Sequence, residues 1–304
     1  MRVVISGGSG FIGEPLVRAL QARGDDVAVL TRHPSHVNAG RALVWDPGAR
    51  DGAWRAETAS ADAVVNLAGE NVAGRWTAER KQRIVDSRVT ATRALIEALE
   101  LEPGRSRVLV SASAVGFYGN RNDELLDEQA ESGSGFLAGV VRQWEELAHG
   151  ADHVARVVIL RFGVVLAANG GALGKMLLPF RIGVGGPIAS GKQWMSWVDR
   201  DDVVRMILRA IDRESARGVY NVTAPEPVRN RDFTRALGAA LHRPALLPAP
   251  SFALRLLFGE MADETLIGGQ RVVPKRATSE GFVFQYPTLG AALEHALHSD
   301  GPAR

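Results

Sequence analysis

A glycine-rich turn at the start of the chain constrains its fold more than any other feature. Gly7, Gly10 and Gly13 have the spacing GxxGxxG, directly after the apolar residues 3–5 and before a segment with helical periodicity. Glycine suits such a turn because the backbone bends sharply and must approach a pyrophosphate without a Cβ atom in the way. The helix that follows offers free N–H groups and the positive end of its dipole. We therefore predict a strand–turn–helix unit that binds a dinucleotide; the alternative is a turn with a purely structural role.

Short β-branched runs alternate with amphipathic segments over the first two-thirds of the chain. The runs are apolar without alternation, as in buried parallel strands, and occupy residues 3–5, 27–30, 63–65, 108–110, 157–160 and, later, 220–222. Helical periodicity occupies residues 15–21, 78–99, 135–148 and 201–211. This alternation predicts an α/β fold with a Rossmann-type, doubly wound parallel sheet.

Two segments interrupt this pattern and predict a smaller lobe. One is rich in glycine, from Asn169 to Gly191, and the other begins at Pro225 and carries prolines and short helices. We predict a Rossmann domain made of residues 1–168 and 190–224. A mainly helical C-terminal lobe is predicted from residues 169–189 and 225–304.

Composition excludes several classes of protein. The formal net charge is +2, which gives no argument for nucleic acid, and no apolar run is long enough to span a bilayer. The chain has no cysteine, which fits a reducing cytoplasm and excludes thiolate catalysis. Its seven histidines form no tight ligand spacing. We expect a cytoplasmic protein with a small-molecule substrate and without a metal, nucleic acid or membrane partner. Its oligomeric state stays open.

Two further strand ends carry candidate cofactor residues. The second predicted strand ends at Thr31 and Arg32, where NAD-binding domains place a carboxylate for the ribose 2′-hydroxyl. No carboxylate stands here, so we predict that Arg32 meets the 2′-phosphate of NADP(H); the alternative is a solvated arginine on a loop. Leu67, Ala68 and Gly69 follow the next strand and are predicted to contact the cofactor at the carboxyl edge of the sheet.

With this glycine-rich turn and these strand ends, the chain resembles the extended short-chain dehydrogenase/reductase superfamily. Within it, the chain is similar to the YfcH-like epimerase-family subgroup, which has a short C-terminal domain of the DUF1731 type. The segments that carry the resemblance include 66–71 (NLAGEN), 111–119 (SASAVGFYG), 191–194 (GKQW) and 268–276 (GGQRVVPKR), so it covers nearly the whole chain. The resemblance implies NADP(H) as cofactor and suggests a nucleotide sugar or a related substrate.

The resemblance also assigns cofactor positions residue by residue. It implies that the phosphate turn consists of Gly7, Gly10, Phe11 and Ile12, and that the ribose phosphate binds at Thr31 and Arg32. It further implies that Leu67 and Ala68 contact the cofactor where their strand ends, that Arg88 faces the cofactor from a helix, and that Val165 lies near the nicotinamide.

The same resemblance implies a serine and a YxxxK pair for catalysis, and here the chain departs from the pattern. Phe136 stands at the tyrosine position and Val140 at the lysine position, and neither side chain transfers a proton. Ser113 matches the serine, and Tyr118 resembles a second active-site tyrosine. We predict these two as catalytic residues of an NADP(H)-dependent oxidoreductase or epimerase, with Glu70 or water as other proton routes. The alternatives are that both only line a pocket, and that the protein is a non-enzymatic NADP(H)-binding sensor or interaction protein.

Overall fold

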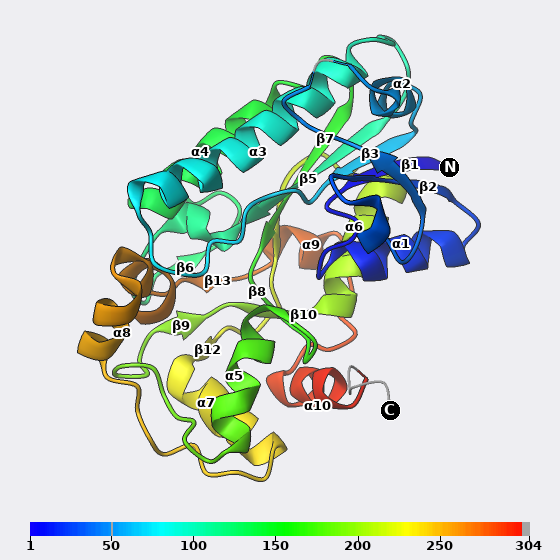
Figure 1. Ribbon diagram of the computed structural model, residues 1–304. Helices are drawn as coiled ribbons and strands as arrows, with labels where there is room; N and C mark the ends of the chain where they lie inside the picture. The colour runs from blue at the N-terminus through cyan, green and yellow to red at the C-terminus, as the bar shows by residue number, and fades with distance from the viewer. Residues whose placement is uncertain (50, 300–304) are drawn as a thin grey trace.

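The computed structural model describes residues 1–49 and 51–299 and confirms the predicted α/β fold class (Figure 1). Seven parallel strands form one sheet in the order β11-β7-β5-β4-β1-β2-β3. Their bounds, in that order, are Gly218–Val222, Arg156–Phe162, Val108–Ala114, Ala63–Asn66, Arg2–Ser6, Asp26–Thr31 and Arg41–Val44. Residues 300–304 of the predicted C-terminal lobe lie outside the described residues.

Helices cover both faces of the sheet because the buried strands are apolar on both sides. In β1, Val3 and Ile5 join one core cluster, whereas Val4 joins the cluster on the opposite face. The first cluster packs under α1 (Gly13–Ala22) and α6 (Arg200–Asp212). The second packs under three helices, which are α2 (Ala53–Ala59), α3 (Ala78–Leu99) and α4 (Phe136–His149).

The edge strand β3, Arg41–Val44, is one element that the sequence pattern did not predict. All four of its residues are exposed or half-buried, because only β2 pairs with it and no strand lies beyond it. Its apolar run, residues 42–45, is separated from the end of β2 by only ten residues, which is too few for the crossover helix that the predicted strand–helix alternation requires.

The lower part of the molecule in Figure 1 gathers the glycine-rich segment and the C-terminal region. A separate apolar cluster joins α5 (Gly171–Arg181), α7 (Asn230–Ala240) and α10 (Leu289–Ser299) around Trp197. Short two-stranded ladders connect this part to the rest: β8 (Val164–Leu166) with β10 (Trp197–Asp199), β9 (Trp194–Met195) with β12 (Val228–Arg229), and β6 (Leu125–Leu126) with β13 (Arg271–Val272). The predicted lobe boundaries themselves stay a prediction.

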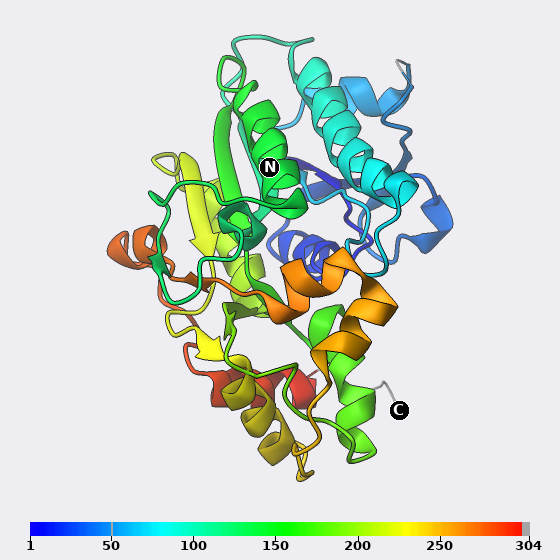
Figure 2. The same ribbon diagram turned by 90° about the vertical axis from the view of Figure 1, so that its left-hand side faces the viewer.

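The remaining C-terminal helices are α8 (Ser251–Phe258), η3 (Ala262–Ile267) and α9 (Lys275–Ser279). In Figure 2 the gold and orange segment that contains α8 and η3 lies between the upper helices and α5. No helix in the described part of the chain is both long enough and apolar enough to cross a membrane.

Candidate cofactor and active site

The predicted phosphate turn lies between β1 and α1 and requires glycine for steric reasons. Gly7 has a φ of +76°, and a Cβ atom there would lie 2.8 Å from the carbonyl oxygen of Leu67. A Cβ atom at Gly13 would lie 2.1 Å from the carbonyl oxygen of Gly7. The Gly10 amide donates to that same oxygen at 3.0 Å. The start of α1 therefore lies tightly against the end of β1, as in a helix N-terminus that binds a pyrophosphate.

The strand order reverses between β1 and β4, and the segments that leave these strands meet. The Leu67 amide donates to the carbonyl oxygen of Ser6 at 3.0 Å. Ile12, Leu67 and Val165 are all partly buried against the same core cluster. The structure thus places three of the predicted cofactor residues on the same face of the sheet, each after the carboxyl end of a strand. In open α/β sheets the crevice at such a reversal is where dinucleotides bind.

The end of β2 presents Arg32 without a counterion. Thr31 is buried, and its Oγ1 accepts a hydrogen bond from the His33 amide at 3.0 Å. Arg32 is exposed, and its guanidinium has no ion pair or hydrogen bond with any described residue. Residues 31–37 contain no carboxylate. An arginine placed in this way suits a phosphate, which it can bind through two parallel N–H···O bonds.

Arg88 projects from α3 to the exit of β4. Its Nη1 donates to the carbonyl oxygens of Glu70 at 3.1 Å and Ile84 at 3.0 Å, and its Cζ would lie 3.0 Å from a Cβ atom at Gly69. The guanidinium also lies 5.1 Å from the ring centre of Trp144 on α4. Burial lowers the pKa of Arg88 to about 10, with only the negative charge of Glu70 acting in the opposite direction. The side chain is therefore still charged at neutral pH.

Phe11 connects the phosphate turn to the glycine-rich segment. Cβ atoms at Gly170 and Gly171 would lie 2.7 Å and 3.0 Å from its ring, so these glycines make room for the aromatic side chain. The Arg200 guanidinium lies 5.3 Å from the ring centre and donates to Asn169 Oδ1 at 2.6 Å. A cavity of about 530 Å³ opens between these residues and the start of α1.

Ser113 and Tyr118 both belong to one buried polar network. The Ser113 hydroxyl donates to Glu145 of α4, whose carboxylate also accepts two bonds from Arg161 at 2.8 Å and 2.7 Å. Arg161 donates to the Tyr118 hydroxyl at 2.8 Å, and that hydroxyl donates to Asn221 Oδ1 at 2.7 Å. All five side chains are buried.

This arrangement affects the chemistry that Tyr118 can perform. Burial raises the pKa of its hydroxyl, although Arg161 beside it acts in the opposite direction. A proton-transfer group works best with a pKa near the operating pH, so the shift is unfavourable for that role. The catalytic role of Ser113 and Tyr118 stays a prediction.

The positions of the missing YxxxK pair are filled by an apolar cluster. Phe136 and Val140 pack with Trp76 and with Met261, which precedes η3. The Phe136 and Trp76 rings meet edge to face at 4.9 Å, and the Lys81 ammonium lies 4.8 Å from the centre of the Phe136 ring. The C-terminal region therefore contributes directly to this part of the molecule.

Glu264 of η3 caps the helix that carries these two positions. The amides of Phe136 and Leu137 donate to its two carboxylate oxygens at 2.7 Å and 2.9 Å. Gly135 leaves room for the carboxylate, because a Cβ atom there would lie 2.8 Å from Glu264 Oε1. A negative charge at the first turn of α4 also complements the helix dipole.

Several residues of the site carried no specific prediction. Arg161 lies within the apolar strand β7, and a charged residue in such a run signals a buried partner, although not which one. Glu145 is that partner, on the buried face of α4. Glu264 accepts hydrogen bonds from amides more than 120 residues earlier in the chain, so no local sequence pattern could predict this cap.

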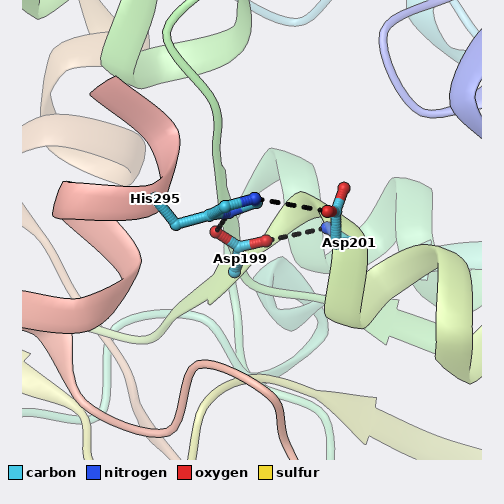
Figure 3. A group of neighbouring side chains, drawn as sticks. All are labelled: Asp199, Asp201 and His295. Carbon is cyan, nitrogen blue, oxygen red and sulfur yellow. Dashed lines mark hydrogen bonds and ion pairs between the residues drawn. The ribbon is translucent and has the colours of Figure 1, made fainter. Parts of the chain in front are cut away.

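Asp199, Asp201 and His295 form a second polar group, at the start of α6 (Figure 3). His295 Nδ1 lies 2.9 Å from Asp199 and its Nε2 lies 3.4 Å from Asp201, while the Asp201 amide donates to Asp199 at 2.8 Å. Asp199 is the N-cap of α6, and burial raises the pKa of its carboxyl group. The nitrogen and oxygen atoms that could coordinate a metal ion thus interact with one another, and they connect α10 to the start of α6.

A parallel sheet with a GxxGxxG turn at its point of reversal, followed by a C-terminal region that packs on the start of α4, defines an extended Rossmann protein. The chain belongs to the NAD dependent epimerase/dehydratase family, whose model matches residues 3–223. A domain of unknown function, DUF1731, matches residues 249–296. Both matches confirm the resemblance inferred from the sequence.

Full-length relatives support the same assignment. The chain is 38% identical to the human epimerase family protein SDR39U1 over 301 residues, covering 98% of this chain and 100% of the relative. It is 41% identical to an Arabidopsis thaliana homologue described as chloroplastic, over 96% of this chain and 86% of that protein. A crystal structure of human SDR39U1 with NADPH matches with a TM-score of 0.87 and 35% identity, over 97% of this chain and 99% of that one.

Proposed function

We propose that this chain binds NADP(H) and acts as an oxidoreductase or epimerase on a small molecule, with a nucleotide sugar as one candidate. The observation that carries the choice of cofactor is Arg32, which is exposed and unpaired at the end of β2, where no carboxylate follows. Gly7, Gly10 and the start of α1 fit a pyrophosphate. The human relative crystallised with NADPH supports the same cofactor.

The residues of this chain would bind the cofactor and control proton transfer, while NADP(H) supplies the hydride chemistry when bound. Ser113 and Tyr118 are our proposed catalytic residues. Their hydroxyls already donate to Glu145 and Asn221, so proton transfer through either one requires this network to rearrange. Glu70, which is half-buried beside Arg88, and water are the other routes.

A second candidate function is an NADP(H)-binding sensor without turnover. It is favoured by Phe136 and Val140, which pack in an apolar cluster instead of offering a proton-transfer pair. Both candidates share the cofactor and differ in whether a substrate reacts.

Titration of the wild-type protein with NADPH and NADH tests the cofactor. We expect NADPH to bind about ten- to a hundredfold more tightly, because hydrogen bonds to charged groups contribute about 1.5–3 kcal/mol. Protein fluorescence or calorimetry measures both constants. Equal affinities for the two cofactors would contradict the assignment.

Turnover distinguishes the enzyme from the sensor. With saturating cofactor, we expect slow or absent epimerisation of standard nucleotide sugars, because positions 136 and 140 lack a proton-transfer pair. Product analysis over hours gives the rate, with Tyr118→Phe and Ser113→Ala as matched variants. Brisk turnover that both variants leave unchanged would show that these residues are not catalytic.

The small-molecule partner and the cytoplasmic location belong to the same proposal. No nucleic acid or membrane partner is proposed, since the net charge is only +2.

A further inference from the structure

Arg88 is a charged side chain whose guanidinium is only partly used by the protein. Nη1 donates to two carbonyl oxygens, but Nε and Nη2 have no hydrogen-bond acceptor among the described residues. No carboxylate of the described chain lies within ion-pair distance, and the Glu70 carboxylate acts on Arg88 only through its charge, apart from the hydrogen bond to the Glu70 carbonyl oxygen. A cation that is partly withdrawn from water is normally paired, so this one has the character of a ligand-binding group.

The position of Arg88 assigns it to one half of the crevice. Arg32 stands at the end of β2, on one side of the strand reversal, whereas Arg88 lies at the exit of β4, on the other side. Its guanidinium lies between α3 and α4. On α3 it donates to the carbonyl oxygen of Ile84, a residue that packs with Val140 of α4. On α4 it lies over the ring of Trp144, one helical turn beyond Val140. If the 2′-phosphate binds at Arg32, the nicotinamide half extends toward Arg88.

We propose that Arg88 lies against the nicotinamide half of the cofactor, where its unpaired positive charge favours the neutral reduced ring of NADPH over the cationic ring of NADP⁺. The inference rests on the proposed binding of NADP(H). Like charges in a partly buried site repel each other strongly, whereas a neutral ring avoids this cost. The chain is thereby biased toward holding the reduced cofactor, as a reductase does.

Three ligands and four proteins test this inference. NADPH, NADP⁺ and 2′,5′-ADP, which lacks the nicotinamide half, are titrated into wild type, Arg88→Met, Arg88→Lys and Arg93→Met. Methionine has a similar length but no charge, lysine keeps the charge, and Arg93 is an exposed arginine on the same helix. Calorimetry gives all the constants without requiring turnover.

We expect wild type to prefer NADPH to NADP⁺ by about tenfold, equivalent to about 1.4 kcal/mol. Arg88→Met should reduce this preference to about twofold or less and leave 2′,5′-ADP binding unchanged, while Arg88→Lys and Arg93→Met keep the preference. The inference is overturned if wild type shows no preference, if Arg88→Met keeps it, or if that variant weakens 2′,5′-ADP as much as NADPH. Failure of wild type to bind any of the three ligands would instead overturn the proposed function, and this inference with it.

Discussion

Replacing Arg32 by alanine should weaken NADPH binding about ten- to a hundredfold and leave NADH binding nearly unchanged. The side chain is exposed at the end of β2 and has no partner in the described chain, so its loss disturbs no internal contact. The 2′-phosphate carries close to two negative charges, and hydrogen bonds to charged groups contribute about 1.5–3 kcal/mol. Fluorescence titration of both cofactors on wild type and variant measures the change.

Salt dependence and a matched variant complete this test. Wild-type NADPH affinity should fall with increasing salt, and the fall should be shallower in Arg32→Ala because one charge pair has been removed. Arg2→Ala is the control, since Arg2 is exposed at the opposite end of β1. An Arg32→Ala variant that loses NADH and NADPH affinity equally would mean that Arg32 does not bind the 2′-phosphate.

Replacing Glu145 by alanine should lower the free energy of unfolding by about 3–5 kcal/mol. Glu145 accepts both Arg161 bonds and the Ser113 hydroxyl, and all three side chains are buried. Its removal leaves the Arg161 guanidinium in the core without a counterion, which costs more than the loss of the contact itself. Urea denaturation of the wild type and the variant gives the difference.

Glu146→Ala is the matched control, because Glu146 is the next residue on α4 and is exposed. Its effect should stay within about 0.5 kcal/mol. If Glu145→Ala were as stable as Glu146→Ala, the ion pair with Arg161 would not stabilise the fold. The position of Ser113 would then need another explanation, because Glu145 is the acceptor that fixes its hydroxyl.

The sheet and its glycine-rich turn could be predicted from the sequence because each depends on local pattern. The helix predicted over 78–99 coincides with α3, and the apolar runs coincide with the strands that are buried on both faces. Gly7 and Gly13 follow the same logic, since a steric requirement at a turn determines the residue type. The edge strand β3 lies outside the alternation of strands and helices, because the described residues 32–40 between it and β2 form no crossover helix.

The contacts that shape the candidate catalytic region could not be predicted in this way. They join residues far apart in sequence, such as Arg161 with Tyr118 and Met261 with Val140. A sequence pattern gives residue types and spacing, and it was the family resemblance that implied a shared active site for Ser113 and Tyr118. It does not give the direction of a hydroxyl, which depends on partners contributed by other elements.

The cap that Glu264 forms on α4 means that the Rossmann part of this chain takes some of its helix-capping groups from the C-terminal region. Two amides at the first turn of α4 find their acceptors only in a residue contributed by the DUF1731 region. A Rossmann fragment that ended before this region would expose both amides together with the apolar surface around Phe136 and Val140. The small C-terminal region and the large domain therefore constrain each other's sequence, and a change in one of them at this contact calls for a matching change in the other.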